Sequence, residues 1–156
     1  MLDGAAPWGI MCYEKGIYLD DLSEDVIRVF VEHYPRKTSP LSVVPIQLLR
    51  GAYTRVGEDE TAFGGRRKGT WSLSIAGQVP EAERLEAERA WVRAFWEALR
   101  PYSRDATGYM NHMSEYEEDR MRATFGPAKH DRLARIKAVY DPDNVFHLNA
   151  NIKPAI

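Results

Sequence analysis

Two short segments carry polar side chains of the types that take part in chemistry. In the first, Tyr109, Asn111 and His112 follow one another closely on a predicted strand over residues 108–113. Burial on a strand would require a hydrogen-bond partner for each of these side chains. The segment is therefore either a site for a bound molecule or a solvated edge strand, and its residue types fit both.

The second segment is the end of the chain, residues 141–154, with the sequence DPDNVFHLNANIKP. Asp141 precedes a proline, which disfavours helical backbone at that position, so a predicted helix ends there. An extended tail rich in asparagine follows, and we expect it to lie over the body of the protein. It is either part of a site or a clamp that holds the C-terminus.

Motifs that would fix the class of enzyme directly are absent from the sequence. The four histidines are isolated and form neither HxxxH nor HExxH, so no zinc site is predicted. The glycine-rich loop 64–69, GGRRKG, precedes a predicted strand, whereas phosphate-binding glycine loops lead into a helix. We interpret it as a solvated basic loop. Cys12 is the single cysteine, which excludes an internal disulfide.

Composition narrows the choice of partners. The 156 residues include 21 Lys and Arg and 23 Asp and Glu, for a net charge of -2. This balance gives no reason to expect nucleic acid or an anionic membrane as a partner, and it suits a small neutral substrate. No apolar stretch reaches the roughly 20 residues that span a bilayer, and the N-terminus resembles no signal peptide. We expect a cytoplasmic protein.

The predicted elements favour an α+β fold, an antiparallel or mixed sheet covered on one face by helices. Residues 50–56 are expected to be extended or hairpin-like. The strands are expected at 44–48, 70–75 and 108–113, and the helices at 23–34, 80–100, 114–126 and 127–140. Because few elements remain to cover the second face of the sheet, a missing domain is predicted. An uncovered apolar face would also permit a homo-oligomer.

The sequence resembles the berberine-bridge-like branch of the FAD-linked oxidases. DPDNVFHLNANIKP is similar to the terminal motif of that family, and GYMNHM, residues 108–113, to its Tyr-x-Asn strand. RGAYTRVGEDETAFGGR, residues 50–66, resembles its Gly-Gly-Ala segment with the later Thr-Ala-Phe and Arg. YEKGIYLDDLSEDVI, residues 13–27, resembles the helix entry that precedes them. These four motifs occur in the family's order.

This resemblance implies a flavoprotein in which the sheet of a substrate domain covers the isoalloxazine ring of FAD. Residues 1–104 match part of that substrate domain, 105–156 match the C-terminal segment, and the FAD-binding domain is absent. The implied function is oxidation of a small organic molecule by hydride transfer to flavin, once an FAD-binding domain or subunit is supplied. Alone, the chain is expected to be inactive. The alternative is a non-catalytic docking subunit or a degenerate remnant.

The resemblance also assigns site residues. Tyr109 and Asn111 match positions that line the flavin side of the pocket. His112 replaces a tyrosine that acts as a base, and imidazole can accept a proton at neutral pH. Arg55 replaces a catalytic glutamate; being always charged, it is expected to bind the substrate, together with Tyr53. Strict strand alternation places His112 on the face opposite Tyr109, unless the strand ends or bulges there.

Overall fold

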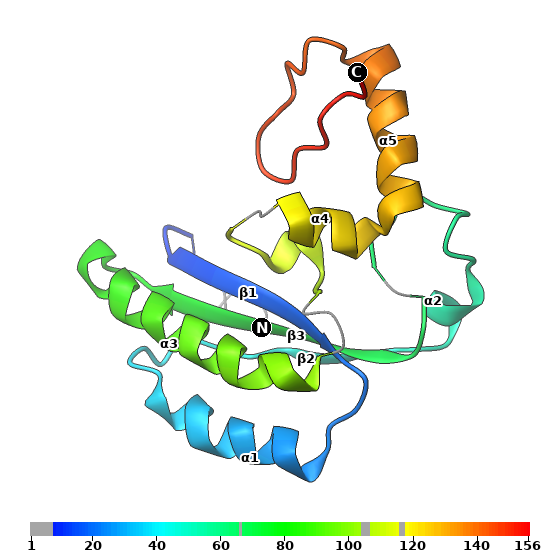
Figure 1. Cartoon of the computed structure of the whole chain (residues 1–156). Helices are drawn as coiled ribbons and strands as arrows, with labels where there is room; N and C mark the ends of the chain where they lie inside the picture. The colour runs from blue at the N-terminus through cyan, green and yellow to red at the C-terminus, as the bar shows by residue number, and fades with distance from the viewer. Residues whose placement is uncertain (1–7, 66, 104–106, 116–117) are drawn as a thin grey trace.

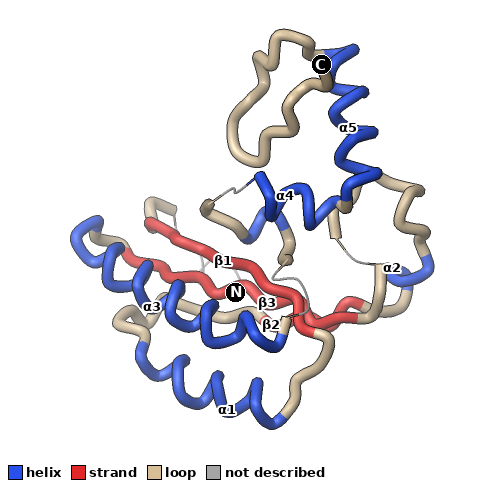
Figure 2. The backbone as a smooth tube through the Cα atoms, viewed as in Figure 1, coloured by secondary structure: helices blue, strands red, loops and turns tan. Residues whose placement is uncertain are grey.

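The computed structural model describes residues 8–65, 67–103, 107–115 and 118–156. This part of the chain forms a three-stranded antiparallel sheet in the order β1-β3-β2, with helices packed on one face (Figures 1 and 2). The strands are β1 (Met11–Leu19), β2 (Ile46–Leu49) and β3 (Thr70–Val79). The predicted α+β class, with an antiparallel sheet covered on one face by helices, is confirmed.

Alternation along the strands gives the sheet one strongly apolar face. Ile17 in β1 lies opposite Leu73 in β3, and the odd-numbered residues of both strands face the same side. Helix α3 (Leu85–Leu99) covers this face. The shared core consists of Tyr13, Ile17, Leu19, Val26, Leu73, Ile75, Trp91, Val92, Phe95, Trp96 and Leu99.

Helix α1 (Glu24–His33) packs on α3, whereas the sequence predicted that it would pack on the sheet. The sequence favours Ser23 as the cap of this helix, because it precedes Glu24 and Asp25, and its side chain accepts a hydrogen bond from the amide of Val26. Phe30 meets Phe95 edge to face at 5.0 Å between ring centroids. Since a helix offers a narrower partner surface than a sheet, Val31 remains 70% exposed.

Two further predictions of secondary structure were wrong. Strand β1 was not expected, although it pairs with β3 along its whole length, from Met11–Val79 to Leu19–Trp71. The segment 50–56 contains a short helix, α2 (Ala52–Arg55), in place of an extended or hairpin-like chain. Gly51, with φ of 68°, makes the turn from β2 into this helix, a backbone conformation that glycine adopts without a steric cost.

The predicted strand over residues 108–113 is replaced by a segment that follows the outer edge of β1. Tyr18 donates its amide hydrogen to the carbonyl oxygen of Thr107 at 2.8 Å, and Met113 forms an isolated bridge with Lys15. Between these two contacts the chain makes a 3-10 turn over Met110–His112. The segment therefore leaves the edge of β1 at the residues that were expected to carry the chemistry.

Helices α4 (Glu118–Phe125) and α5 (Pro127–Tyr140) continue the chain away from the sheet (Figure 1). The sequence SEYE, residues 114–117, favours a capping box at the start of α4, but residues 116 and 117 lie outside the described part of the chain. Ser114 instead accepts a hydrogen bond from the amide of Glu14 in β1.

The C-terminal tail turns back along α5, whereas the sequence predicted that it would cover the body. The amide of Ala155 donates to the carbonyl oxygen of Ala134 at 3.0 Å. Asp141 accepts hydrogen bonds from the amides of Val145 and Phe146. The helix and its tail therefore form one projecting unit.

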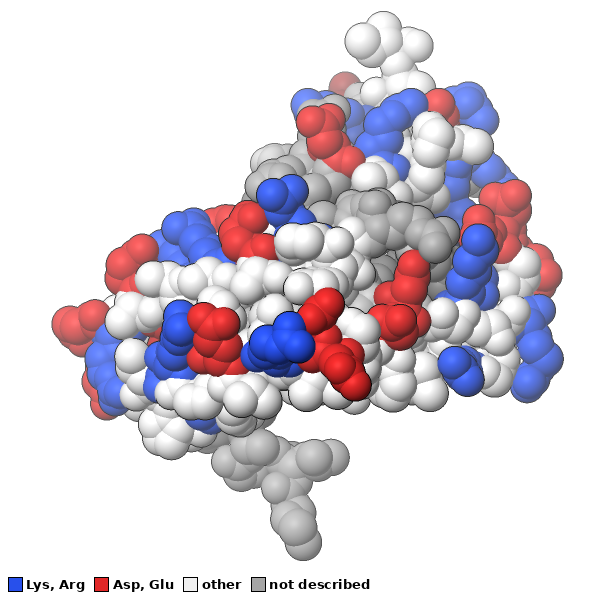
Figure 3. Space-filling view, turned by 60° about the horizontal axis from the view of Figure 1, so that its bottom comes forward, with Lys and Arg blue, Asp and Glu red and all other residues white. Residues whose placement is uncertain are grey.

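Charges are mixed over the surface. Figure 3 shows basic and acidic side chains interspersed on the face that it displays, with uncharged surface between them. Within the described part of the chain, no helix has the length and apolarity needed to span a lipid bilayer.

Candidate functional site

The second face of the sheet carries a hollow of about 240 Å³. Its floor is a row across all three strands, because Tyr18 pairs with Ser72 and Ser72 pairs with Gln47 in the register of the sheet. Such a row points to one face, opposite to the core that α3 covers. The residues that line the hollow are Tyr18, Gln47, Leu49, Tyr53, Phe63, Ser72 and Tyr109.

Three aromatic rings form the wall of this hollow. Phe63 stacks on Tyr109 with 5.9 Å between ring centroids and meets Tyr53 edge to face at 5.7 Å. The guanidinium of Arg67 lies over the rings of both Phe63 and Tyr53, at 4.7 and 5.0 Å from their centroids. Arg67 also donates to the hydroxyl of Thr61 at 2.8 Å. A planar cation so placed holds the loop and its rings in one arrangement.

Two glycines place Tyr109 beside the hollow. A Cβ at Gly108 would come within 2.5 Å of the carbonyl carbon of Gly16, so no side chain fits between these two backbones. A Cβ on Gly16 would in turn lie 3.2 Å from the Cβ of His112. The segment 107–112 therefore passes directly over Gly16 of β1.

The 3-10 turn gathers three of the predicted site residues into one cluster. His112 meets the ring of Tyr109 edge to face at 5.1 Å, and Asn111 donates its side-chain amide to the Tyr109 hydroxyl at 2.7 Å. The alternation that would have separated His112 from Tyr109 does not apply, because this backbone is not a strand.

The predicted site residues are brought together only in part. Tyr53 and Tyr109 line the hollow. His112 contacts the ring of Tyr109 but is not among the lining residues, and Asn111 is exposed. Arg55 is exposed on the outer side of α2 and does not line the hollow. The guanidinium that contacts the aromatic wall belongs to Arg67, from the loop that was interpreted as solvated and basic.

Sequence reasoning missed five of the seven lining residues, Leu49 among them. Tyr18 lies on the strand that was not predicted, and Gln47, Ser72 and Phe63 were not selected as site residues. The available signal was alternation in β1, in which Gly16 and Tyr18 share one face while Ile17 and Leu19 share the other. It was hidden because that strand follows a glycine- and proline-containing stretch that resembles a loop.

The phenols of Tyr18 and Tyr53 stay neutral at physiological pH. Burial raises the pKa of Tyr18 strongly, and the nearby Tyr53 and Tyr109 add to this effect. Burial also raises the pKa of Tyr53, although the Arg67 guanidinium partly opposes it. The hydroxyls therefore keep their protons and can donate hydrogen bonds to an uncharged molecule.

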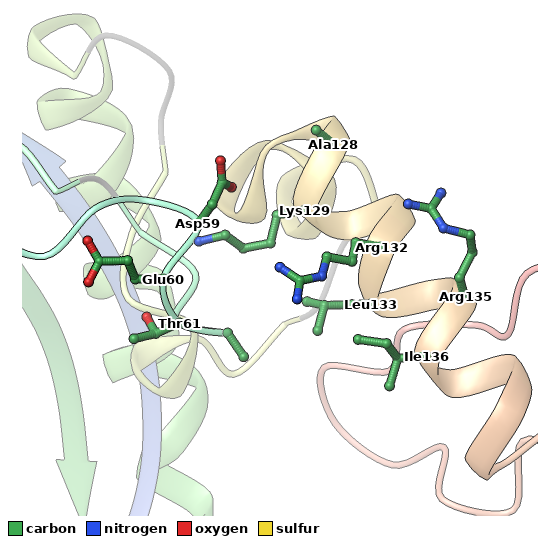
Figure 4. A pocket seen from close by; sticks show the side chains of 10 residues that line it. Asp59, Glu60, Thr61, Ala128, Lys129, Arg132, Leu133, Arg135 and Ile136 are labelled. Atoms are coloured by element: carbon green, nitrogen blue, oxygen red, sulfur yellow. The ribbon is translucent and has the colours of Figure 1, made fainter.

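A second hollow, of about 420 Å³, lies between the loop 59–62 and the first turns of α5 (Figure 4). Charged residues line it from both sides, Asp59 and Glu60 on the loop and Lys129 and Arg132 on the helix. The Glu60 carboxylate points away from the helix and accepts a hydrogen bond from the amide of Gly57 at 2.9 Å. Lys129 donates to the carbonyl oxygens of Phe63, at 3.0 Å, and of Glu58. We interpret this hollow as a structural contact between α5 and the loop that carries Phe63, and not as a binding site.

Metal binding finds no support in the geometry. Among residues 8–65, 67–103, 107–115 and 118–156, no three His, Cys, Asp or Glu side chains are grouped so as to hold a metal ion. The glycine-rich loop leads into β3 and not into a helix, so it does not form a phosphate cradle of the usual type.

Comparison with known proteins finds similarity to FAD-linked oxidoreductases. Residues 108–153 match the family model described as "Berberine and berberine like". The chain is 23% identical over 156 residues to an FAD-linked oxidoreductase of Dictyostelium discoideum, an alignment that covers 99% of this chain and 33% of the relative. The chain therefore spans about a third of the length of this curated relative.

Solved structures show the same fold. The berberine-bridge-enzyme-like protein 1 of Physcomitrella patens superposes with a TM-score of 0.77 at 21% identity, over 94% of this chain and 31% of that one. The 6-hydroxy-D-nicotine oxidase of Arthrobacter nicotinovorans superposes with a TM-score of 0.70 at 20% identity, over 99% and 35%. The resemblance to the C-terminal part of the berberine-bridge-like FAD-linked oxidoreductases is confirmed.

Proposed function

We propose that this chain supplies the substrate side of an FAD-dependent oxidoreductase, whose FAD-binding part is a preceding domain or a separate subunit. The observation that carries the proposal is the aromatic hollow on the sheet face that α3 leaves free. The chain's span of about a third of its FAD-linked relative supports the need for a further part. The division into residues 1–104 and 105–156 stays a prediction, since its boundary lies outside the described residues.

The described residues fit one side of a flavin. Tyr109 and Asn111 would border the isoalloxazine ring, because Tyr109 lines the hollow and the exposed Asn111 donates a hydrogen bond to the Tyr109 hydroxyl. The pyrophosphate would be held by the other part, since the described residues offer no glycine loop that opens a helix. A bound flavin would supply the acceptor for a hydride.

The residues of this chain would orient the substrate and move its proton. For an alcohol, His112 would accept the hydroxyl proton as the hydride leaves the adjacent carbon, which yields the carbonyl product. Because His112 contacts Tyr109 and does not line the hollow, this role requires the substrate hydroxyl to extend past the Tyr109 ring. The Nδ1 of His112 is buried and has no hydrogen-bond partner in the described part of the chain. Tyr53 and Phe63 would hold an aromatic substrate against the sheet.

The surface that meets the FAD-binding part is proposed to include α5 and its tail. Apolar side chains there are unusually exposed: Val139, Tyr140, Val145, Phe146 and Leu148 range from 66% to 84%. Isolated proteins rarely expose many large apolar side chains in one region. The second sheet face, by contrast, carries small and polar residues such as Ser72, Ser74 and Gln78. A homo-oligomer through that face and a cytoplasmic location stay predictions.

Complementation would test the proposal. The chain would be produced together with the preceding two thirds of the Dictyostelium discoideum FAD-linked oxidoreductase, purified, and mixed with benzyl alcohol without oxygen. We expect a yellow protein whose flavin absorbance bleaches as benzaldehyde forms. The matched control is the FAD-binding portion alone, which should bind flavin but not be reduced.

The outcomes separate the proposal from its alternative. Flavin that is bound but not reduced by any member of a panel of alcohols, sugars and alkaloid-like amines would favour a docking subunit or a remnant. Failure of the two parts to associate, with a relative's own C-terminal part as the positive control, would contradict the proposed assembly.

A further inference from the structure

Two tyrosines of β1 have equally buried rings but opposite hydrogen-bonding states. Tyr13 is 3% exposed and its hydroxyl accepts a hydrogen bond from Nε of Arg93 at 3.1 Å. Tyr18 is 2% exposed, and its hydroxyl has no partner among the residues that the structure describes. The register places them on opposite faces of the sheet.

A buried hydroxyl without a partner costs stability, so its presence calls for a reason. The Tyr18 side chain lines the hollow, and the loop backbone passes close above its hydroxyl: a Cβ on Gly65 would come within 3.1 Å of that oxygen. A phenylalanine would fill the same space without the unsatisfied group. The Tyr18 hydroxyl is therefore expected to form a hydrogen bond with a bound molecule that the free chain does not contain.

We infer that Tyr18 is a positioning residue of the hollow, whose hydroxyl donates a hydrogen bond to an oxygen atom of the bound substrate. Burial keeps this phenol protonated, and a neutral phenol is a good donor to a carbonyl or alcohol oxygen. The surrounding rings select a flat, uncharged molecule, and Tyr18 selects one that carries oxygen. This inference rests on the proposed function, because the occupant is taken to be the substrate of that reaction.

The ligand arm of the test uses two probes that differ only in the acceptor oxygen, acetophenone and ethylbenzene. Each is titrated into the 156-residue chain while the NMR signals of Leu49 and Ser72, which line the hollow, are followed. The parent is expected to bind acetophenone more tightly by about 2- to 12-fold, the ratio that one neutral hydrogen bond gives. Tyr18→Phe should bind both probes equally.

The stability arm compares the same substitution at the two buried tyrosines. Tyr18→Phe removes an unsatisfied hydroxyl, so the melting temperature of the ligand-free chain should rise by at least about 2 °C. Tyr13→Phe removes a hydrogen bond to Arg93, so its melting temperature should fall. Tyr13→Phe should keep the parental preference for acetophenone, because Tyr13 lies on the other face.

Each contrary result would overturn the inference. If Tyr18→Phe melts no higher than the parent, the hydroxyl already has a partner. The inference also fails if neither probe shifts the NMR signals of Leu49 and Ser72, or if the parent binds both probes equally. In either case the Tyr18 hydroxyl does not donate a hydrogen bond to an oxygen atom of the ligand. These results are independent of flavin reduction in the complemented protein, so failure of this inference is distinguishable from failure of the proposed function.

Discussion

Gly108 lies in direct backbone contact with Gly16, and this contact sets where the 107–113 segment meets β1. A Cβ at position 108 would lie 2.5 Å from the carbonyl carbon of Gly16 and 2.6 Å from its oxygen. Side-chain rotation cannot relieve such a clash, because both obstructing atoms belong to the backbone. The placement of Tyr109 and His112 therefore depends on two residues that carry no side chain.

Gly108→Ala should lift this segment from β1 and lower the stability by about 1–3 kcal/mol, the usual cost of overpacking. The amide of Tyr18 should lose protection from hydrogen exchange, since it donates to Thr107 in the native chain. Gly69→Ala is the matched control, because its Cβ would meet only the flexible side chain of Arg50, at 3.4 Å. An unchanged exchange rate at Tyr18 in Gly108→Ala would contradict the close contact.

Glu88→Gln should destabilise the protein by about 2–3 kcal/mol at neutral pH, the scale for hydrogen bonds to a buried charge. Although Glu88 is fully buried, its carboxylate accepts hydrogen bonds from the side chains of Ser42 and Thr38 and from the amides of Thr38 and Ser39. These bonds tie the loop after α1 to α3. Thermal or urea unfolding would measure the loss.

The same carboxylate predicts a pH dependence. Burial alone would raise the pKa of Glu88, but the hydrogen bonds from Ser42, Thr38 and Ser39 outweigh it and hold the pKa below its ordinary value. Its contribution to stability is therefore complete above the pKa of the unfolded chain and is lost as the pH falls through the folded-state pKa. Glu88→Gln should flatten this acidic limb, whereas Glu86→Gln, at an exposed pair with Arg89, should leave it intact.

His112→Phe in the complemented enzyme should slow flavin reduction by about 10²- to 10⁴-fold, the usual scale for loss of a general base. Phenylalanine preserves the ring that packs against Tyr109 and removes both nitrogens. Substrate affinity should change little, because a base acts mainly in the transition state. Anaerobic stopped-flow mixing isolates this step. The control is His33→Phe, because His33 stacks on Phe95 on the helix-covered side of the sheet, away from the hollow. An unchanged rate in His112→Phe would assign the role of base to Tyr109 or Tyr53.

The isolated chain should not hold FAD tightly. Tyr109 and Asn111 offer contacts to one side of a flavin only, and so few contacts do not offset the entropy lost on association. A titration followed by flavin fluorescence would measure this. Stoichiometric binding at micromolar FAD would show that this chain contains a complete cofactor site.

The sequence predicted elements correctly where neighbouring residues alone determine the structure, as in helix capping, turns and apolar periodicity. Ser23 and Gly126 mark helix starts through capping and turn chemistry, and α3 follows its apolar periodicity, so these elements were predicted close to their observed positions. Strand β1 was missed because its stability comes from β3, far along the chain, and not from its own residues. Tertiary pairing of this kind leaves little trace in a short window of sequence.

The candidate site was predictable for residues inside recognisable motifs and not for those that packing brings to them. Tyr53 and Tyr109 stand in such motifs and line the hollow. The place of His112 depends on a 3-10 turn over Met110–His112, where the sequence predicted a strand. Arg67 could not be distinguished from its basic neighbours, because its role arises from rings contributed by α2 and by its own loop.

The strand order β1-β3-β2 also determines when each strand can pair as the chain leaves the ribosome. The first two strands to leave the ribosome do not pair with each other in the described sheet; each pairs with β3, which follows both. β2 therefore stays unpaired until residues 70–73 have emerged, and β1 completes its pairing only when Val79 has emerged. The apolar side chains of Ile17 and Leu19 stay exposed until their partners in β3 arrive. Helix α3 follows only a few residues later, so the nascent chain gains its sheet and the cover of its apolar face almost together.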